Sequence, residues 1–92
     1  MNEKMNKDWV LYHLKKSKES IESVISEIES NPEYEYGNYV VDMGYLYHHL
    51  NIAWNSRIAT KEQIEIGKND DFPKWNQFPR DLPLKELLSF KK

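Results

Sequence analysis

The chain contains no cysteine, only three glycines and no long hydrophobic run. The absence of cysteine excludes disulfides, thiolate zinc sites and a thiol nucleophile, and it suits a reducing compartment. Three scattered glycines provide no glycine-rich loop for a phosphate. No segment approaches the roughly 18 apolar residues of a membrane span, so we expect a cytoplasmic protein without a membrane partner.

No sign of charge dominates either. The net charge is -2, and we interpret Lys and Glu as interleaved rather than segregated. A protein that neutralises many phosphates normally carries a basic face, so nucleic acid is not an expected partner. The 92 residues predict a single domain, 1–92, with a thin stability margin. Without disulfides, oligomerisation is the expected supplement to that stability.

What the chain does contain is helical periodicity. Residues 7–30 are predicted to form the first helix, with Asn6 or Asp8 as its N-cap. Apolar and small residues recur there at alternating spacings of four and three, which is a heptad pattern. This seam consists of Val10, Leu14, Ser17, Ile21, Val24 and Ile28. The helix is predicted to end at Asn31, because the residue before a proline is disfavoured in the α region.

A second helix is predicted from about residue 35 to 59, followed by a short turn at Thr60 and Gln63, which have the spacing of a capping box. Its larger stripe, predicted to be the core, consists of Tyr36, Tyr39, Val40, Met43, Leu46, Tyr47, Leu50, Ala53, Trp54 and Ile58. A short connection between the two helices predicts an antiparallel hairpin. Its register places Arg57 beside Asp8, so we expect Arg57 to form a structural ion pair with Asp8 or Glu3.

Residues 67–83 contain prolines that exclude a long helix, alternating with large apolar side chains. We expect an extended arm over the helices, followed by a short amphipathic helix at about residues 84–90. The apolar residues of the arm are Phe72, Trp75, Phe78 and Leu82.

The second helix also has a smaller semi-apolar face, bordered by Asp42. A helix at the surface of a monomer needs only one apolar stripe, so either the arm or another chain is expected to cover this face. We predict an interaction surface, and twofold pairing of two hairpins over it would make a four-helix bundle. The predicted surface consists of Val41, Tyr45, His48, His49, Ile52 and Ser56.

Candidate chemistry centres on His48 and His49. No second histidine or carboxylate lies three or four residues from either on this helix, so a single-helix metal site is excluded. A metal site would need His13, which the register places within about a turn of His49, or a second subunit. No serine lies in a nucleophile motif. We therefore predict no catalytic residues, no cofactor and no metal.

The sequence predicts an all-α hairpin with a C-terminal arm, paired as a homodimeric four-helix bundle. The expected function is non-enzymatic binding of another protein, as a regulator, an adaptor or an immunity-type inhibitor. The alternative is a metal-binding or acid-base enzyme whose site at a subunit interface uses Asp42, Tyr45, His48 and His49.

Overall fold

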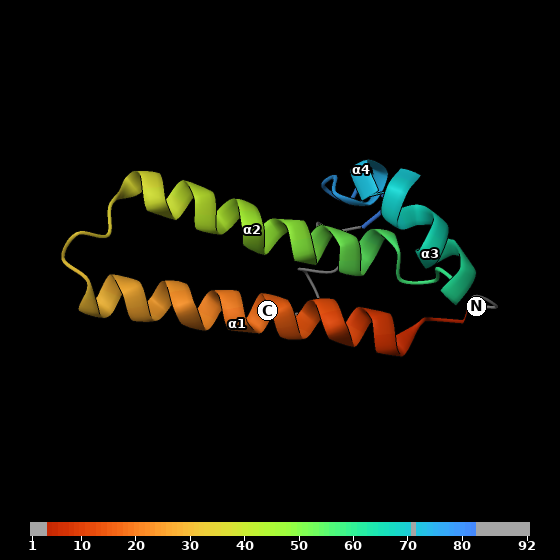
Figure 1. The fold of residues 1–92 in the computed structure, drawn as a ribbon, viewed down its shortest axis with the longest axis horizontal. Helices are drawn as coiled ribbons and strands as arrows, with labels where there is room; N and C mark the ends of the chain where they lie inside the picture. The colour runs from red at the N-terminus through yellow and green to blue at the C-terminus, as the bar shows by residue number, and fades with distance from the viewer. Residues whose placement is uncertain (1–3, 71, 83–92) are drawn as a thin grey trace.

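The computed structural model describes residues 4–70 and 72–82, and within these ranges every regular element is helical. The two long helices form an antiparallel hairpin, and two shorter helices lie beside the end of the second (Figure 1). The elements are α1 (Lys7–Ser30), α2 (Tyr36–Asn55), α3 (Lys61–Asp70) and α4 (Phe72–Trp75). In the described part of the chain, no helix is long and apolar enough to cross a membrane. The all-α class and the hairpin are thus confirmed.

Both ends of α1 agree with the prediction. The side chain of Asn6 accepts a hydrogen bond of 3.1 Å from the backbone N–H of Trp9, so Asn6 is the N-cap. At the other end, the backbone N–H of Asn31 donates to the carbonyl of Glu27 at 2.9 Å, and Pro32 follows. This proline prevents the helix from continuing.

α2 begins with a capping box, in which the backbone N–H of Glu35 donates to the side chain of Asn38 at 3.0 Å. It ends at Asn55, four residues before the predicted residue 59. Side chains satisfy the last carbonyls of the helix: the Ser56 hydroxyl donates to the carbonyl of Ile52, and the Arg57 guanidinium donates to that of Trp54.

The predicted capping box at Thr60 and Gln63 is present, with reciprocal hydrogen bonds of 2.8 and 3.1 Å. It starts the ten-residue α3 rather than a short turn. The prediction of an extended arm from residue 67 is wrong up to Trp75, because α3 and α4 occupy most of that stretch. Pro73 fits because it lies in the first turn of α4, where its missing N–H has no helical partner to lose. The predicted helix at 84–90 lies outside the described residues.

The hydrophobic core lies at the open end of the hairpin, where α3 and α4 pack on it. Ile52 is completely buried there, with Ala59, Ile64 and Trp75 around it and Trp9 of α1 against the cluster. The ring of Trp75 packs directly on Gly67, so closely that a Cβ at this position would overlap it. α3 thus needs a glycine at this contact.

The contact between α1 and α2 is formed mainly by small and polar side chains. The buried residues of α1 are His13, Ser17, Ser20 and Val24, and those of α2 include Leu46, His49 and Ala53. Most of the two predicted core stripes is therefore not between the helices. Leu14, Ile21 and Ile28 of the heptad seam are 43 to 57% exposed, as are several residues of the larger α2 stripe.

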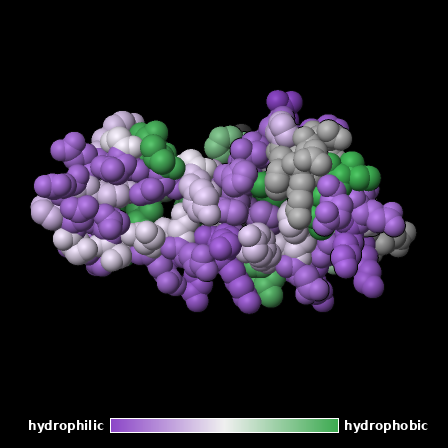
Figure 2. Space-filling view, viewed as in Figure 1, coloured by the Kyte–Doolittle hydropathy of each residue, from purple (hydrophilic) through white to green (hydrophobic). Residues whose placement is uncertain are grey.

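Helix geometry places these two exposed stripes on the same side of the hairpin. At roughly 100° per residue, the exposed seam residues Leu14, Ile21 and Ile28 lie about 70° around α1 from its buried residues. Tyr39 and Leu50 lie about 60° around α2, in the same sense, from the residues that α2 buries against α1. Because the helices are antiparallel, both rotations lead to one broad side. Figure 2 shows the opposite broad side of the molecule, which is mostly hydrophilic, with hydrophobic residues in separate patches.

Candidate functional site

Both long helices expose apolar residues on this broad side, which we name the apolar face; the segment after α4 packs at its α2 edge, where Phe78 contacts Tyr47 at 5.3 Å between ring centroids. Its α1 members lie between 43 and 57% exposed, and its α2 members between 36 and 40%. Exposed apolar surface that runs along two adjacent helices is characteristic of an interaction site. The apolar face consists of Leu14, Ile21, Ile25 and Ile28 of α1 with Tyr39 and Leu50 of α2.

The surface predicted from the sequence lies elsewhere and is largely interior. Ile52 is fully buried, Ser56 is 2% exposed and His49 is 7% exposed, so the prediction that they meet another chain is wrong. Ile52 and Ser56 pack instead at the open end of the hairpin, where the Ser56 hydroxyl accepts a hydrogen bond of 2.7 Å from the Trp9 indole. Val41 and Tyr45 are exposed, at 71 and 52%, and His48 is half-buried.

A histidine pair joins the two long helices in the interior. Nδ1 of His13 and Nδ1 of His49 are 2.8 Å apart, so one ring donates a hydrogen bond to the other. Trp9 contacts the His13 ring edge-on at 4.5 Å between centroids, and Tyr45 contacts that of His49 at 4.7 Å. The predicted proximity of His13 to His49 is therefore correct. His48 completes the cluster, with its ring centroid 5.1 Å from that of His49.

Burial favours the neutral forms of His13 and His49. Burial, followed by the neighbouring His49 and His48, lowers the pKa of His13 to about 4. The pKa of His49 is lowered as well, first by burial and then by His48 and Lys16. Nε2 of His13 is buried without a hydrogen-bond partner among the described residues. An unprotonated Nε2 is the less costly state, which makes His13 the donor and His49 the acceptor of the shared hydrogen bond.

A cleft of about 820 Å³ adjoins this cluster between α1, α2 and α3. Its walls combine aromatic rings with charges of both signs, and no serine, threonine or cysteine lines it. Such walls can hold an apolar group, and they offer no hydroxyl of serine or threonine and no thiol as a nucleophile. The lining residues are Asn6, Asp8, Trp9, Tyr12, His13, His48, His49, Lys61, Ile64 and Glu65.

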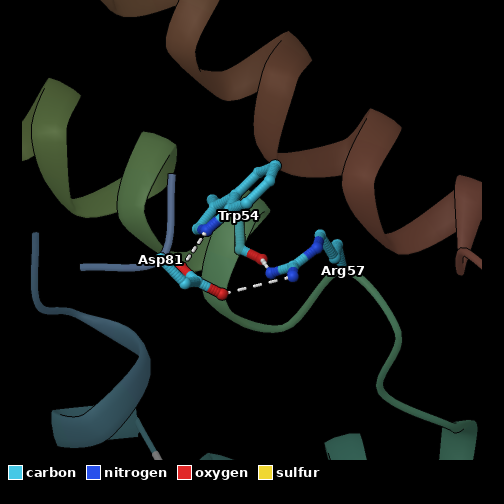
Figure 3. A network of polar contacts seen from close by, with 3 residues as sticks. All are labelled: Trp54, Arg57 and Asp81. Atoms are coloured by element: carbon cyan, nitrogen blue, oxygen red, sulfur yellow. Dashed lines mark hydrogen bonds and ion pairs between the residues drawn. The ribbon is translucent and has the colours of Figure 1, made fainter. Parts of the chain in front are cut away.

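Arg57 does not form the predicted ion pair with Asp8, and Glu3, the other predicted partner, lies outside the described residues. Its guanidinium lies 3.3 Å from the carboxylate of Asp81, and Asp81 also accepts a hydrogen bond of 2.7 Å from the Trp54 indole (Figure 3). The guanidinium stacks over the Trp54 ring at 3.8 Å. These contacts lower the pKa of Asp81, with the Trp54 hydrogen bond as the largest cause. The network fastens the segment after α4 to the end of α2. Asp81 is 24 residues from Arg57 in the sequence, so helical spacing could not reveal this ion pair.

Of the residues named in the alternative hypothesis, Tyr45 and His48 contact His49, whereas Asp42 bonds elsewhere. Within residues 4–70 and 72–82, no three His, Cys, Asp or Glu side chains are grouped closely enough to hold a metal ion. The carboxylate of Asp42 accepts a hydrogen bond of 2.7 Å from the Tyr34 hydroxyl, while the Nδ1 of His49 bonds to His13. The proposed partners Asp42 and His49 are thus engaged with different groups.

Comparison with protein families, with curated proteins and with solved structures finds no match to this chain.

Proposed function

We propose that this protein acts without catalysis, by binding a helical protein surface through its apolar face. The observation that carries the proposal is the exposure of Leu14, Ile21 and Ile28 of the heptad seam on the same side as the partly exposed Tyr39 and Leu50 of α2. This role includes a regulator, an adaptor or an immunity-type inhibitor.

The composition of the hairpin supports this proposal. The contact between α1 and α2 is made largely by serine, histidine and alanine, while Leu14, Ile21, Ile25 and Ile28 of α1 are exposed on the apolar face. A two-helix hairpin cannot bury such a stripe by itself, and a facing pair of helices would turn it into a bundle core. Heptad spacing is the pattern by which helices pack along their length.

The simplest assembly of this kind is a homodimeric four-helix bundle. The 20 residues of α2 span about 30 Å, and two adjacent helices are about 20 Å wide, which gives a flat footprint of about 600 Å². Accessible area exceeds a flat footprint, so the face approaches the roughly 800 Å² that each partner contributes to a standard interface. In a twofold dimer, each copy contributes the same set of residues to the interface.

The test is light scattering of the purified chain with two matched variants. The native chain is expected to give about 22 kDa, twice the 11.1 kDa of one chain. Ile21→Asp should give a monomer with an unchanged helical circular dichroism spectrum, because residue 21 lies on the apolar face. Val41→Asp, at an exposed aliphatic residue away from this face, should leave the dimer intact. Dissociation by Val41→Asp instead would place the interface on the other side.

A further inference from the structure

Charge is distributed unevenly along α1 and the turn that follows it. Residues 4–18 contain five lysines and one aspartate, whereas residues 19–35 contain six glutamates and no basic residue. This corrects the interpretation of interleaved charges, which averaged over the chain. The hairpin is therefore basic along α1 at its open end and acidic at its turn end.

Ion pairs within the chain do not neutralise the two ends. In the described part of α1 they join Lys16 to Glu19 at 3.6 Å and Lys18 to Glu22 at 3.9 Å. Both lie at the boundary between the basic and acidic halves. The excess of each sign thus remains further along the helix, exposed to any helix that packs alongside.

Charges of both signs follow the outer edge of the apolar face, and among them Lys18 already pairs with Glu22 of its own chain. By helical rotation, Lys7, Lys15, Glu22 and Glu29 lie beside the seam on the side of α1 away from α2, and all four are exposed. Charges that flank an apolar seam set the orientation of the helix that packs on it.

We propose that two copies pair antiparallel through the apolar face, so that the acidic half of α1 in each copy lies across the basic half of α1 in the other. This inference rests on the proposed function and names its partner as a second copy. A twofold axis through the midpoint of α1 places Lys15 opposite Glu22 of the partner copy, and Lys7 within a residue of Glu29 of the partner copy. Symmetry makes each pair twice.

The opposite orientation gains less from the same charges. A twofold axis parallel to the helices would place α1 of each copy across α2 of the other, with both turn ends at the same end of the dimer. The flanking lysines and glutamates of α1 would then have no row of opposite charges across from them, because Asp42 is the one Asp, Glu, Lys or Arg residue of α2. Only the antiparallel pairing makes the face complementary to itself in both shape and charge.

Charge reversal tests the orientation by the sign of its effect. The antiparallel dimer predicts that Glu22→Lys with Glu29→Lys weakens dimerisation about tenfold or more at low salt, since four attractive pairs become repulsive. Lys7→Glu with Lys15→Glu should weaken it similarly, and mixing the two variants should restore a heterodimer. Lys7→Glu places a negative charge at the N-terminus of α1, and Glu29→Lys places a positive charge near its C-terminus, so both changes interact favourably with the helix dipole. Unfolding therefore does not account for the weaker dimerisation. Stronger dimerisation of the variant with Glu22→Lys and Glu29→Lys would overturn the antiparallel orientation.

Spin-label distances give a second, independent readout. The chain has no cysteine, so Ser30→Cys and Ser23→Cys can be labelled singly. In the antiparallel dimer, labels at residue 30 lie about 35 Å apart along the helix axis and labels at residue 23 about 14 Å apart. Equal separations at both positions in a dimer would refute the orientation while leaving the proposed function intact. A chain that is monomeric at high concentration would overturn the pairing of two copies, because something else must then occupy the apolar face.

Discussion

The buried histidine pair predicts that the protein loses stability in mild acid. In the unfolded chain His13 has an ordinary pKa of about 6.5, while in the folded protein its pKa is lowered to about 4. Because the folded pKa is the lower one, the stabilising contribution is complete above pH 6.5 and is lost as the pH falls towards 4. Over this interval the unfolded state binds a proton that the folded state does not.

The magnitude follows from the two pKa values. At pH 5 the unfolded chain has protonated His13 almost fully and the folded chain hardly at all, which reduces the free energy of unfolding by about 2 kcal/mol. At pH 4 the reduction reaches about 3 kcal/mol. The side chain is only 3% exposed, so solvent screening removes little of this effect. His49, whose pKa is also lowered, increases the loss in the same direction.

The assay is urea denaturation followed by circular dichroism between pH 7.5 and pH 4, at a fixed protein concentration. His13→Phe keeps a ring among Trp9, Tyr12 and His49 but cannot titrate. The free energy of unfolding of this variant at pH 7.5 should be lower than that of the native chain, because His49 loses its hydrogen-bond partner. Between pH 7.5 and pH 5 the variant should lose about 2 kcal/mol less of this free energy than the native chain does. An equally steep decline in this variant would refute the assignment of the acid sensitivity to the pair.

Two further predictions concern packing. Gly67→Ala should destabilise the protein by about 1 to 2 kcal/mol, because the new methyl group overlaps the ring of Trp75. Gly44→Ala should instead stabilise α2 by up to about 1 kcal/mol, because a Cβ at residue 44 meets nothing within 4 Å. Ile52→Ala should cost about 2 to 4 kcal/mol, since Ile52 is completely buried, whereas Val41→Ala should be close to neutral. Denaturant midpoints of all four variants decide both, and a neutral Ile52→Ala would contradict the described core.

Local signals predicted the helices of the hairpin well. The N-cap at Asn6 and the stop before Pro32 determine α1 without any tertiary contact. The proximity of His13 and His49 followed from antiparallel register alone. The end of α2 was predicted too late because Ser56 and Arg57 turn the chain through side-chain hydrogen bonds, which no periodicity reveals.

The assignment of faces on α2 was wrong for a different reason. Periodicity detects stripes, and the larger apolar stripe was taken as the contact with α1. The structure instead places small and polar residues such as Ala53 and His49 between the helices, and leaves Leu50 and Tyr39 partly exposed. A hydrophobic pattern predicts that a face is to be buried, but it does not distinguish burial within the chain from burial by another chain.

The most direct test of the central claim is the mass of the chain in solution with and without Ile21→Asp. Light scattering at high protein concentration should give about 22 kDa for the native chain and 11.1 kDa for the variant, with the same helix content in both. A native mass of 11.1 kDa under these conditions would contradict pairing through the apolar face.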